Sequence, residues 1–226
     1  MMAGLVLVFD LDDTLYEELT FVKSGFRAVA RYLGETGRIP AAAAMEFMER
    51  RLQKGREGVF DDLLREYGIF SKRLVRKCLA VYRGHKPEIT LAPDARRCLA
   101  RFAHYPKYIV TDGNKLVQAN KIKALELEDK VVYAYITHRY GLKHAKPSPY
   151  CFLKICEREG GSPGEVVYFG DNPHKDFVGI KPLGFKTVRV LKGPYRQVEM
   201  GEEYEAGRRV RTLDEVDEEF LQSLLR

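Results

Sequence analysis

Short apolar runs alternate with helix-like patterns over most of the chain. Runs of four to eight apolar residues are typical of fully buried parallel strands. Such strands are predicted at residues 5–9, 107–111, 131–137, 166–170 and 187–191. Between and around the later strands, helical spacing predicts helices at residues 92–104, 116–125, 149–159 and 175–183. Strands that alternate with helices favour right-handed crossovers, so we expect an α/β fold with a parallel sheet.

A helical block interrupts this pattern after the first strand. Apolar residues recur at helical spacing from residue 16 to about residue 85, as in Phe21, Phe26 and Val29, and no convincing strand is predicted there. The tail beyond residue 210 is expected to be a peripheral closing element ending in a helix. We therefore predict a core domain formed by residues 1–15 and 88–226, with an all-helical domain inserted at residues 16–87.

Three carboxylates follow the first predicted strand within four positions. Asp10, Asp12 and Asp13 lie in the segment DLDDTL at residues 10–15, and parallel sheets place ligand sites at the carboxyl ends of strands. In an extended chain Asp10 and Asp12 would point the same way, and their repulsion would raise a pKa unless a cation lay between them. This arrangement predicts a divalent metal or an acid/base pair, whereas Asp13 is expected to cap or turn the local chain.

The second strand ends in residues that suit an anion. Thr111 is followed by Asp112, Gly113 and Asn114, which offer a hydroxyl and backbone amides at a helix N-terminus, a favourable place for phosphate. A helix cap would explain Thr111 or Asp112 almost as well. This segment alone is therefore a weak signal.

Two later strands are also followed by loops that carry charged side chains. Lys146 lies in the segment KPSP at residues 146–149, where prolines stiffen a loop before a helix. The segment GDNPHKD at residues 170–176 carries Asp171 and Asp176, whose hard oxygens suit Mg²⁺. Each segment alone could be a surface loop or a cap, so the prediction rests on their joint order along the chain.

Together these segments resemble the four motifs of the haloacid dehalogenase (HAD)-like hydrolase superfamily. The resemblance rests on residues 10–15, Thr111, residues 146–149 and residues 170–176, and it spans nearly the whole chain. It implies a Rossmann-like, doubly wound parallel sheet. The helical block lies where subfamily I phosphatases, such as phosphoglycolate phosphatase-like and nucleotidase-like members, carry a helical C1 cap.

The resemblance implies residue roles as well. Asp10 would attack phosphorus to form an aspartyl-phosphate, and Asp12 would protonate the leaving alcohol and later activate water. Mg²⁺ would be held by Asp10, the backbone carbonyl of Asp12, and Asp171. The phosphate would be bound by Thr111, Asp112, Gly113, Asn114 and Lys146, with Asp176 and Asn172 in supporting positions.

The implied activity is a Mg²⁺-dependent phosphatase that hydrolyses a small phosphorylated metabolite. The second aspartate of the pair, Asp12, favours phosphoryl chemistry over dehalogenation, which uses the same nucleophile without a metal. A phosphomutase of the same superfamily and a non-catalytic member that binds a phosphate ligand remain alternatives. Nucleotides, sugar phosphates and phospho-acids are all open as substrates.

Composition and charge narrow the remaining classes. The net charge is +6, but the basic residues are spread along predicted helices, so we expect anionic metabolites as partners and no nucleic acid. No apolar stretch reaches the length of a membrane span and no leader pattern is apparent. Four cysteines without CxxC spacing argue against zinc and against a disulfide scaffold, and they fit the cytoplasm.

Overall fold

The computed structural model describes residues 4–225 and divides the chain into two compact units. One unit runs to residue 18 and resumes at residue 90, and we call it the sheet unit. The other comprises residues 19–89, and we call it the helical unit. Each unit is described by itself below.

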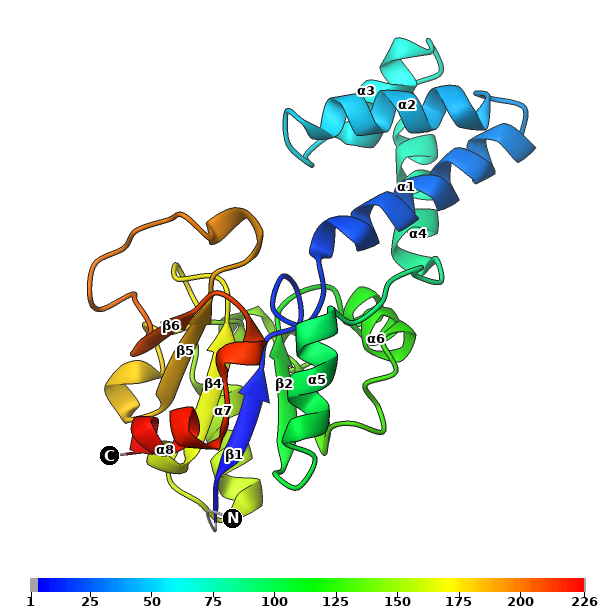
Figure 1. The fold of residues 1–226 in the computed structure, drawn as a ribbon. Coiled ribbons are helices and arrows are strands. Elements are labelled where there is room, and N and C mark those ends of the chain that lie inside the picture. The colour runs from blue at the N-terminus through cyan, green and yellow to red at the C-terminus, as the bar shows by residue number, and fades with distance from the viewer. Residues whose placement is uncertain (1–3, 226) are drawn as a thin grey trace. The chain divides into compact units, whose positions relative to one another are not determined.

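Among the described residues, the sheet unit contains one six-stranded sheet of order β3-β2-β1-β4-β5-β6. The strands are β1 (Val6–Phe9), β2 (Lys107–Thr111), β3 (Tyr133–Ile136), β4 (Val166–Gly170), β5 (Lys186–Val190) and β6 (Arg208–Val210). All neighbours pair in parallel, and β1 lies between β2 and β4 (Figure 1). Every residue of β1, β2 and β4 is buried, as continuous apolar runs require. The predicted α/β fold is confirmed.

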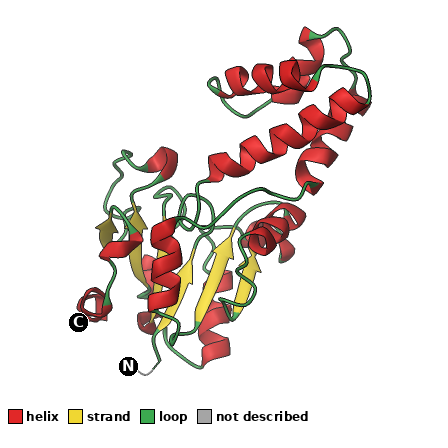
Figure 2. Ribbon diagram, turned by 45° about the vertical axis from the view of Figure 1, so that its right-hand side comes forward, coloured by secondary structure: helices red, strands yellow, loops and turns green. Residues whose placement is uncertain are grey.

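Helices cover both faces of this sheet. They are α5 (Pro93–Arg101), α6 (Lys115–Ala124), α7 (Tyr150–Glu159) and α8 (Glu218–Leu225). Phe152 and Ile155 of α7 pack in one core with Val8 and Tyr108 of the central strands. Figures 1 and 2 show α5 on the opposite face from α7, which is the doubly wound arrangement. The parallel strands therefore all end at one edge, where the polar segments follow them.

The structure corrects two expectations. The predicted helix at residues 175–183 is wrong, because this segment consists of turns and a short 3₁₀ turn at Lys181–Leu183. Its chain passes so close to the Pro147 carbonyl that a Cβ at Gly179 would lie 1.7 Å from that oxygen. Strand β6 was not predicted, because two of its three residues are exposed arginines that conceal any apolar run.

The helical unit has a core of its own. Its helices are α1 (Glu18–Glu35), which begins at the last residue of the sheet unit, α2 (Ala41–Leu52), α3 (Val59–Glu66) and α4 (Lys72–Gly84). Val29, Leu33, Met48 and Leu63 are fully buried in one cluster, so the helical periodicity of the sequence marks the faces that pack together. Residues 19–89 contain no strand.

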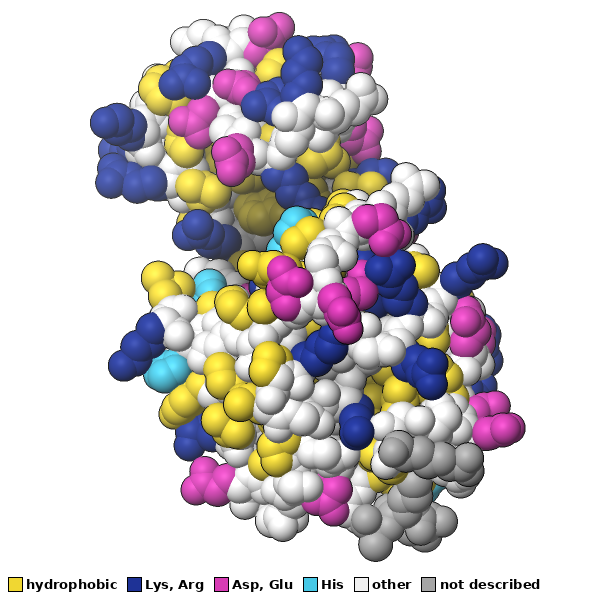
Figure 3. All heavy atoms as spheres, turned by 90° about the vertical axis from the view of Figure 1, so that its left-hand side faces the viewer, with side chains coloured by type: hydrophobic (Ala, Val, Ile, Leu, Met, Phe, Trp, Pro, Cys, Tyr) yellow, Lys and Arg dark blue, Asp and Glu magenta, His cyan; other side chains and the backbone are white. Residues whose placement is uncertain are grey.

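Surface charge is mixed on the face shown in Figure 3, where acidic side chains lie among the lysines and arginines. No helix within residues 4–225 combines the length and the apolar character needed to cross a membrane. The expectation that the protein does not bind nucleic acid stays a prediction.

Candidate active site

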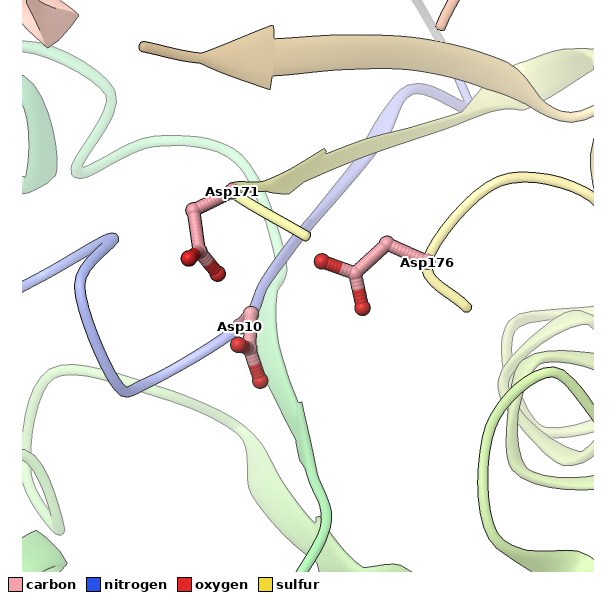
Figure 4. A group of neighbouring side chains, drawn as sticks. All are labelled: Asp10, Asp171 and Asp176. Carbon is pink, nitrogen blue, oxygen red and sulfur yellow. The ribbon is translucent and has the colours of Figure 1, made fainter. Parts of the chain in front are cut away.

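Three buried aspartates converge at the carboxyl ends of β1 and β4. Asp10 follows β1, Asp171 follows β4, and Asp176 lies in the turns after Asp171 (Figure 4). One carboxylate oxygen from each lies within 4.8 Å of one from each of the others. Strands β1 and β4 are neighbours in register, so their ends bring Asp10 and Asp171 together from positions far apart in the sequence. The predicted convergence of these strand ends is therefore present.

Lys146 is the cation inside this group. Its Nζ lies 2.8 Å from an oxygen of Asp10 and 2.8 Å from an oxygen of Asp176, and its side chain is 1% exposed. The same Nζ donates to the hydroxyl of Tyr168, which in turn donates to Asp176. Lys146 thus links the end of β1 to the turns that follow β4.

The group contains more acids than Lys146 alone can neutralise, and the pKa values of two of these acids are raised. Burial raises the pKa of Asp10 to about 7, with Lys146 opposing the rise and Asp176 adding to it. Burial, followed by the charges of Asp10 and Asp176, raises the pKa of Asp171 to about 9. Burial would lower the pKa of Lys146, but these acids hold it well above its usual range. The site therefore favours an additional positive charge.

The three carboxylates fit a hard divalent cation. They offer anionic oxygens in one small buried volume, and such cations prefer oxygen ligands. A cation among them would also remove the cost of placing Asp10 and Asp171 together as anions. In the structure the set contains Asp176 rather than the side chain of Asp12.

Asp12 points instead to helix α6. Its Oδ1 accepts hydrogen bonds from Lys121 Nζ at 2.7 Å and from the hydroxyl of Tyr16, and its Oδ2 accepts from Gln118 Nε2 at 3.0 Å. Burial alone would raise the pKa of Asp12, but Lys121, Tyr16 and Gln118 together hold it below its usual range. Two aspartates separated by one residue thus have opposite electrostatic environments.

Thr111 and the residues after it lie beside the same helix. The hydroxyl of Thr111 is buried and accepts from Gln118 Nε2 at 2.6 Å. Asn114 caps α6 by accepting from the amides of Leu116 and Val117. The side chain of Asn114 is therefore occupied by the helix, and backbone amides are what this segment offers to an anion.

Asp112 organises the loops around the site. Its carboxylate accepts from Thr137 Oγ1 and from the amide of Lys146, and it lies 3.0 Å from Lys175 Nζ. Burial would raise the pKa of Asp112, but Lys146 and Lys175 hold it below its usual range. Asp112 is thus satisfied as an anion by protein groups, and its carboxylate is not a donor for a phosphate.

Asn172 and Asp13 also have local roles. The side-chain oxygen of Asn172 accepts from the backbone amide of His174, and the backbone amide of Asn172 donates to Asp176. Asp13 accepts from the amide of Glu18 and has a positive φ of 53°. These contacts shape the loops that carry Asp10 and Asp171.

Sequence reasoning missed several residues that touch the site, among them Tyr16, Lys175, Gln118, Lys121 and Tyr168. Gln118 and Lys121 are three positions apart and share one face of α6, but a glutamine and a lysine on a helix ordinarily indicate a solvated face. Tyr168 lies within an apolar strand, where a tyrosine ordinarily indicates core. The one signal in the sequence is its hydroxyl, a polar group that needs a hydrogen-bond partner when it is buried in an apolar strand.

Comparison with known proteins agrees with this geometry. The model of the haloacid dehalogenase-like hydrolase family matches residues 5–184. A glyceraldehyde 3-phosphate phosphatase of Pyrococcus furiosus is 30% identical over 206 residues, which cover 86% of this chain and 84% of that protein. A phosphoserine phosphatase of Thermus thermophilus is 26% identical and covers 83% of this chain and 89% of its own length.

Solved structures give the same picture. The crystal structure of a HAD phosphatase from Thermococcus onnurineus matches with a TM-score of 0.59 and 26% sequence identity. The match covers 98% of this chain and 97% of that one.

Proposed function

The chain belongs to the haloacid dehalogenase-like hydrolase family, and on this premise we propose that it is a Mg²⁺-dependent phosphatase of a small phosphomonoester. The observation that carries the proposal is the buried group of Asp10, Asp171 and Asp176 around Lys146. A group with this excess of negative charge is costly to bury, and a divalent metal ion would offset that charge.

Asp10 is the proposed nucleophile. Its carboxylate attacks phosphorus, the bond from phosphorus to the leaving oxygen breaks, and an aspartyl-phosphate forms. Lys146 donates to Asp10 in the free protein, so its ammonium is placed to bind an equatorial phosphate oxygen beside the attacking atom. Backbone amides at the start of α6 and the Thr111 hydroxyl complete the proposed phosphate cradle.

Asp12 is the proposed acid and base. The negative charge of the bound phosphate raises the pKa of Asp12 and favours its protonated form. Asp12 then gives this proton to the departing alcohol, and in the second half of the reaction it recovers a proton from the water that attacks the aspartyl-phosphate. The products are the alcohol and inorganic phosphate, and Asp10 returns to its starting form.

Mg²⁺ is the proposed metal, held by Asp10, Asp171 and the backbone carbonyl of Asp12, and it would neutralise the repulsion between Asp10 and the phosphate. Asp176 is proposed to hold Lys146 in place through their 2.8 Å ion pair. Asn172 supports it by donating its backbone amide to Asp176.

The proposed division of labour follows the domain boundaries expected from the sequence. Residues 1–15 and 88–226 would form the catalytic core, and residues 16–87 would act as the cap that selects the leaving group. The relatives named above carry the names of enzymes for small phosphorylated metabolites, and we propose a substrate of that class. The cysteines at residues 78, 98, 151 and 156 are all free and buried, which supports the proposed cytoplasmic location.

The test is release of inorganic phosphate by the purified protein. p-Nitrophenyl phosphate and a panel of phosphorylated three-carbon acids, aldehydes, sugars and nucleotides are assayed with Mg²⁺ and with EDTA. We expect release that requires Mg²⁺. Isomerisation of a phosphorylated sugar without phosphate release would instead indicate a mutase, and no turnover over the whole panel would favour a non-catalytic role.

A further inference from the structure

Helix α6 carries a pair of side chains that hold both oxygens of Asp12. We propose that Lys121 and Gln118 are positioning residues that orient Asp12 toward the leaving group, and that they thereby determine whether alkyl phosphates are hydrolysed. The inference rests on the proposed phosphatase function. It assigns a role to two residues that have none in the mechanism proposed above.

The contacts are specific to each oxygen. Lys121 Nζ lies 2.7 Å from Oδ1 of Asp12, which also accepts from the Tyr16 hydroxyl, and Gln118 Nε2, the one donor on the other oxygen among the described contacts, lies 3.0 Å from Oδ2. A carboxylate held at both oxygens cannot rotate about its last torsion without breaking a charge-assisted hydrogen bond. The remaining lone pairs of Asp12 are therefore fixed in direction.

Burial makes this arrangement strong. The side chain of Lys121 is 4% exposed and that of Asp12 is 22% exposed, so the pair is shielded on the helix side and open on another. Breaking a buried ion pair by removing one partner leaves an uncompensated charge. An open face on a firmly held carboxylate is what a group that exchanges protons with a substrate requires.

Gln118 also connects Asp12 to the phosphate cradle. The same Nε2 that reaches Asp12 donates to the Thr111 hydroxyl at 2.6 Å. The backbone at Gly113 passes close to this side chain, because a Cβ there would lie 3.3 Å from Gln118, and Gly113 has a φ of +133°. One amide therefore sets the position of the acid relative to the proposed phosphate site.

The chemistry predicts where loss of orientation matters. A nitrophenolate leaves without help, whereas an alkoxide is strongly basic and needs a proton as its bond to phosphorus breaks. The constant kcat/KM reports this first bond-breaking step. Loss of the Lys121 or Gln118 contact should therefore lower kcat/KM for an alkyl phosphate far more than for an aryl phosphate.

The experiment compares p-nitrophenyl phosphate with glycerol phosphate, or with the best alkyl substrate of the panel, at saturating Mg²⁺. For Lys121→Met and for Gln118→Met we expect kcat/KM to fall about 100-fold with the alkyl phosphate and only about threefold with the aryl phosphate. Lys121→Arg keeps a charged donor and should recover most of the alkyl activity. Lys123→Met alters an exposed lysine of the same helix and is the matched control.

Thermal unfolding of each variant separates folding from chemistry. Equal losses on both substrates, or losses that follow the melting temperature, would overturn the inference and leave the phosphatase function standing. If the wild type hydrolyses neither substrate, the proposed function fails and the inference with it. Should Lys121→Met not fold, the Gln118→Met variant gives the same comparison without removing a buried charge.

Discussion

Two groups of buried charge in the sheet unit differ in how their acids are satisfied. In the candidate site, burial and neighbouring acids raise the pKa of Asp10 to about 7 and that of Asp171 to about 9. Asp94 at the start of α5 is also buried, but it accepts from Lys192 Nζ at 2.5 Å, from Thr212 Oγ1 at 2.8 Å and from the Leu213 amide at 3.0 Å. We call this second group the Asp94 anchor.

The difference lies in the sign of the pKa shift. Burial would raise the pKa of Asp94, yet its hydrogen bonds lower it to about 2. The fold therefore stabilises the Asp94 carboxylate, whereas the charges of Asp10 and Asp171 are only partly compensated by Lys146. A buried acid satisfied by the protein holds structure together, whereas one left unsatisfied is a candidate for binding something the protein chain does not supply.

The largest effect is expected from Asp10→Asn. Loss of the proposed nucleophile should reduce phosphate release by about a thousandfold or more. The melting temperature should not fall, because the fold already disfavours the Asp10 charge and Lys146 keeps its contact with Asp176. Steady-state kinetics with p-nitrophenyl phosphate and thermal unfolding measure the two quantities, and a variant that is inactive because it is unfolded would contradict the comparison.

Mg²⁺ should stabilise the protein through the acids of the candidate site and not through the Asp94 anchor. EDTA should remove activity, and Mg²⁺ at about 100 times its dissociation constant should stabilise the wild type by about 2.7 kcal/mol. Asp171→Asn should lose most of this stabilisation, because an acid of the cation-binding group is gone. Asp94→Asn should keep it, and calorimetry of both variants with and without Mg²⁺ checks the contrast.

The Asp94 anchor should matter for stability and not for activity. With a folded pKa of about 2 against an ordinary 3.8, the Asp94 carboxylate contributes about 2 kcal/mol to the free energy of unfolding. Because the folded pKa is depressed, this contribution is present above about pH 4 and is lost as the pH falls toward 2. Asp94→Asn should unfold more easily at pH 7.

Urea unfolding of the wild type and of Asp94→Asn at several pH values gives the measurement. The gap between the two proteins should shrink as the pH falls below 4. A gap that stays constant, or a loss of activity at pH 7 beyond the loss of folded protein, would show that the anchor acts in another way.

The smallest effect is expected at an exposed ion pair of the helical unit. Arg27 and Glu88 are 2.7 Å apart, but their side chains are 43% and 65% exposed. Water screens such pairs, so Arg27→Gln should change the free energy of unfolding by less than about 0.5 kcal/mol. Chemical denaturation checks this. A larger loss would mean that the exposure of an ion pair does not predict its contribution to the free energy of unfolding in this protein.

The contrast between strand ends and helix faces explains what sequence reasoning could predict. The sequence alone could predict that four site residues lie close together, because the carboxyl ends of parallel strands meet at one edge. These residues are Asp10, Lys146, Asp171 and Asp176. The place of Lys121 beside Asp12 could not be predicted, because it depends on how α6 docks on the sheet. A buried lysine that pairs across 109 residues has the same local pattern as a solvated one.

The turns after β4 show the same limit. Apolar residues in this segment have helical spacing, but contacts made by side chains and by the Pro147 carbonyl decide its conformation. Local pattern identifies elements whose burial is regular. It fails where tertiary contacts at the site override the spacing.

Acid-quench trapping of the phosphoenzyme tests the central claim most directly. Wild-type protein turning over a ³²P-labelled phosphomonoester with Mg²⁺ is quenched in acid, digested and mapped. We predict label on the peptide that contains Asp10, release of that label by hydroxylamine as for an acyl phosphate, and no label on Asp10→Asn. Label on a residue other than Asp10, or label that persists in Asp10→Asn, would contradict Asp10 as the nucleophile.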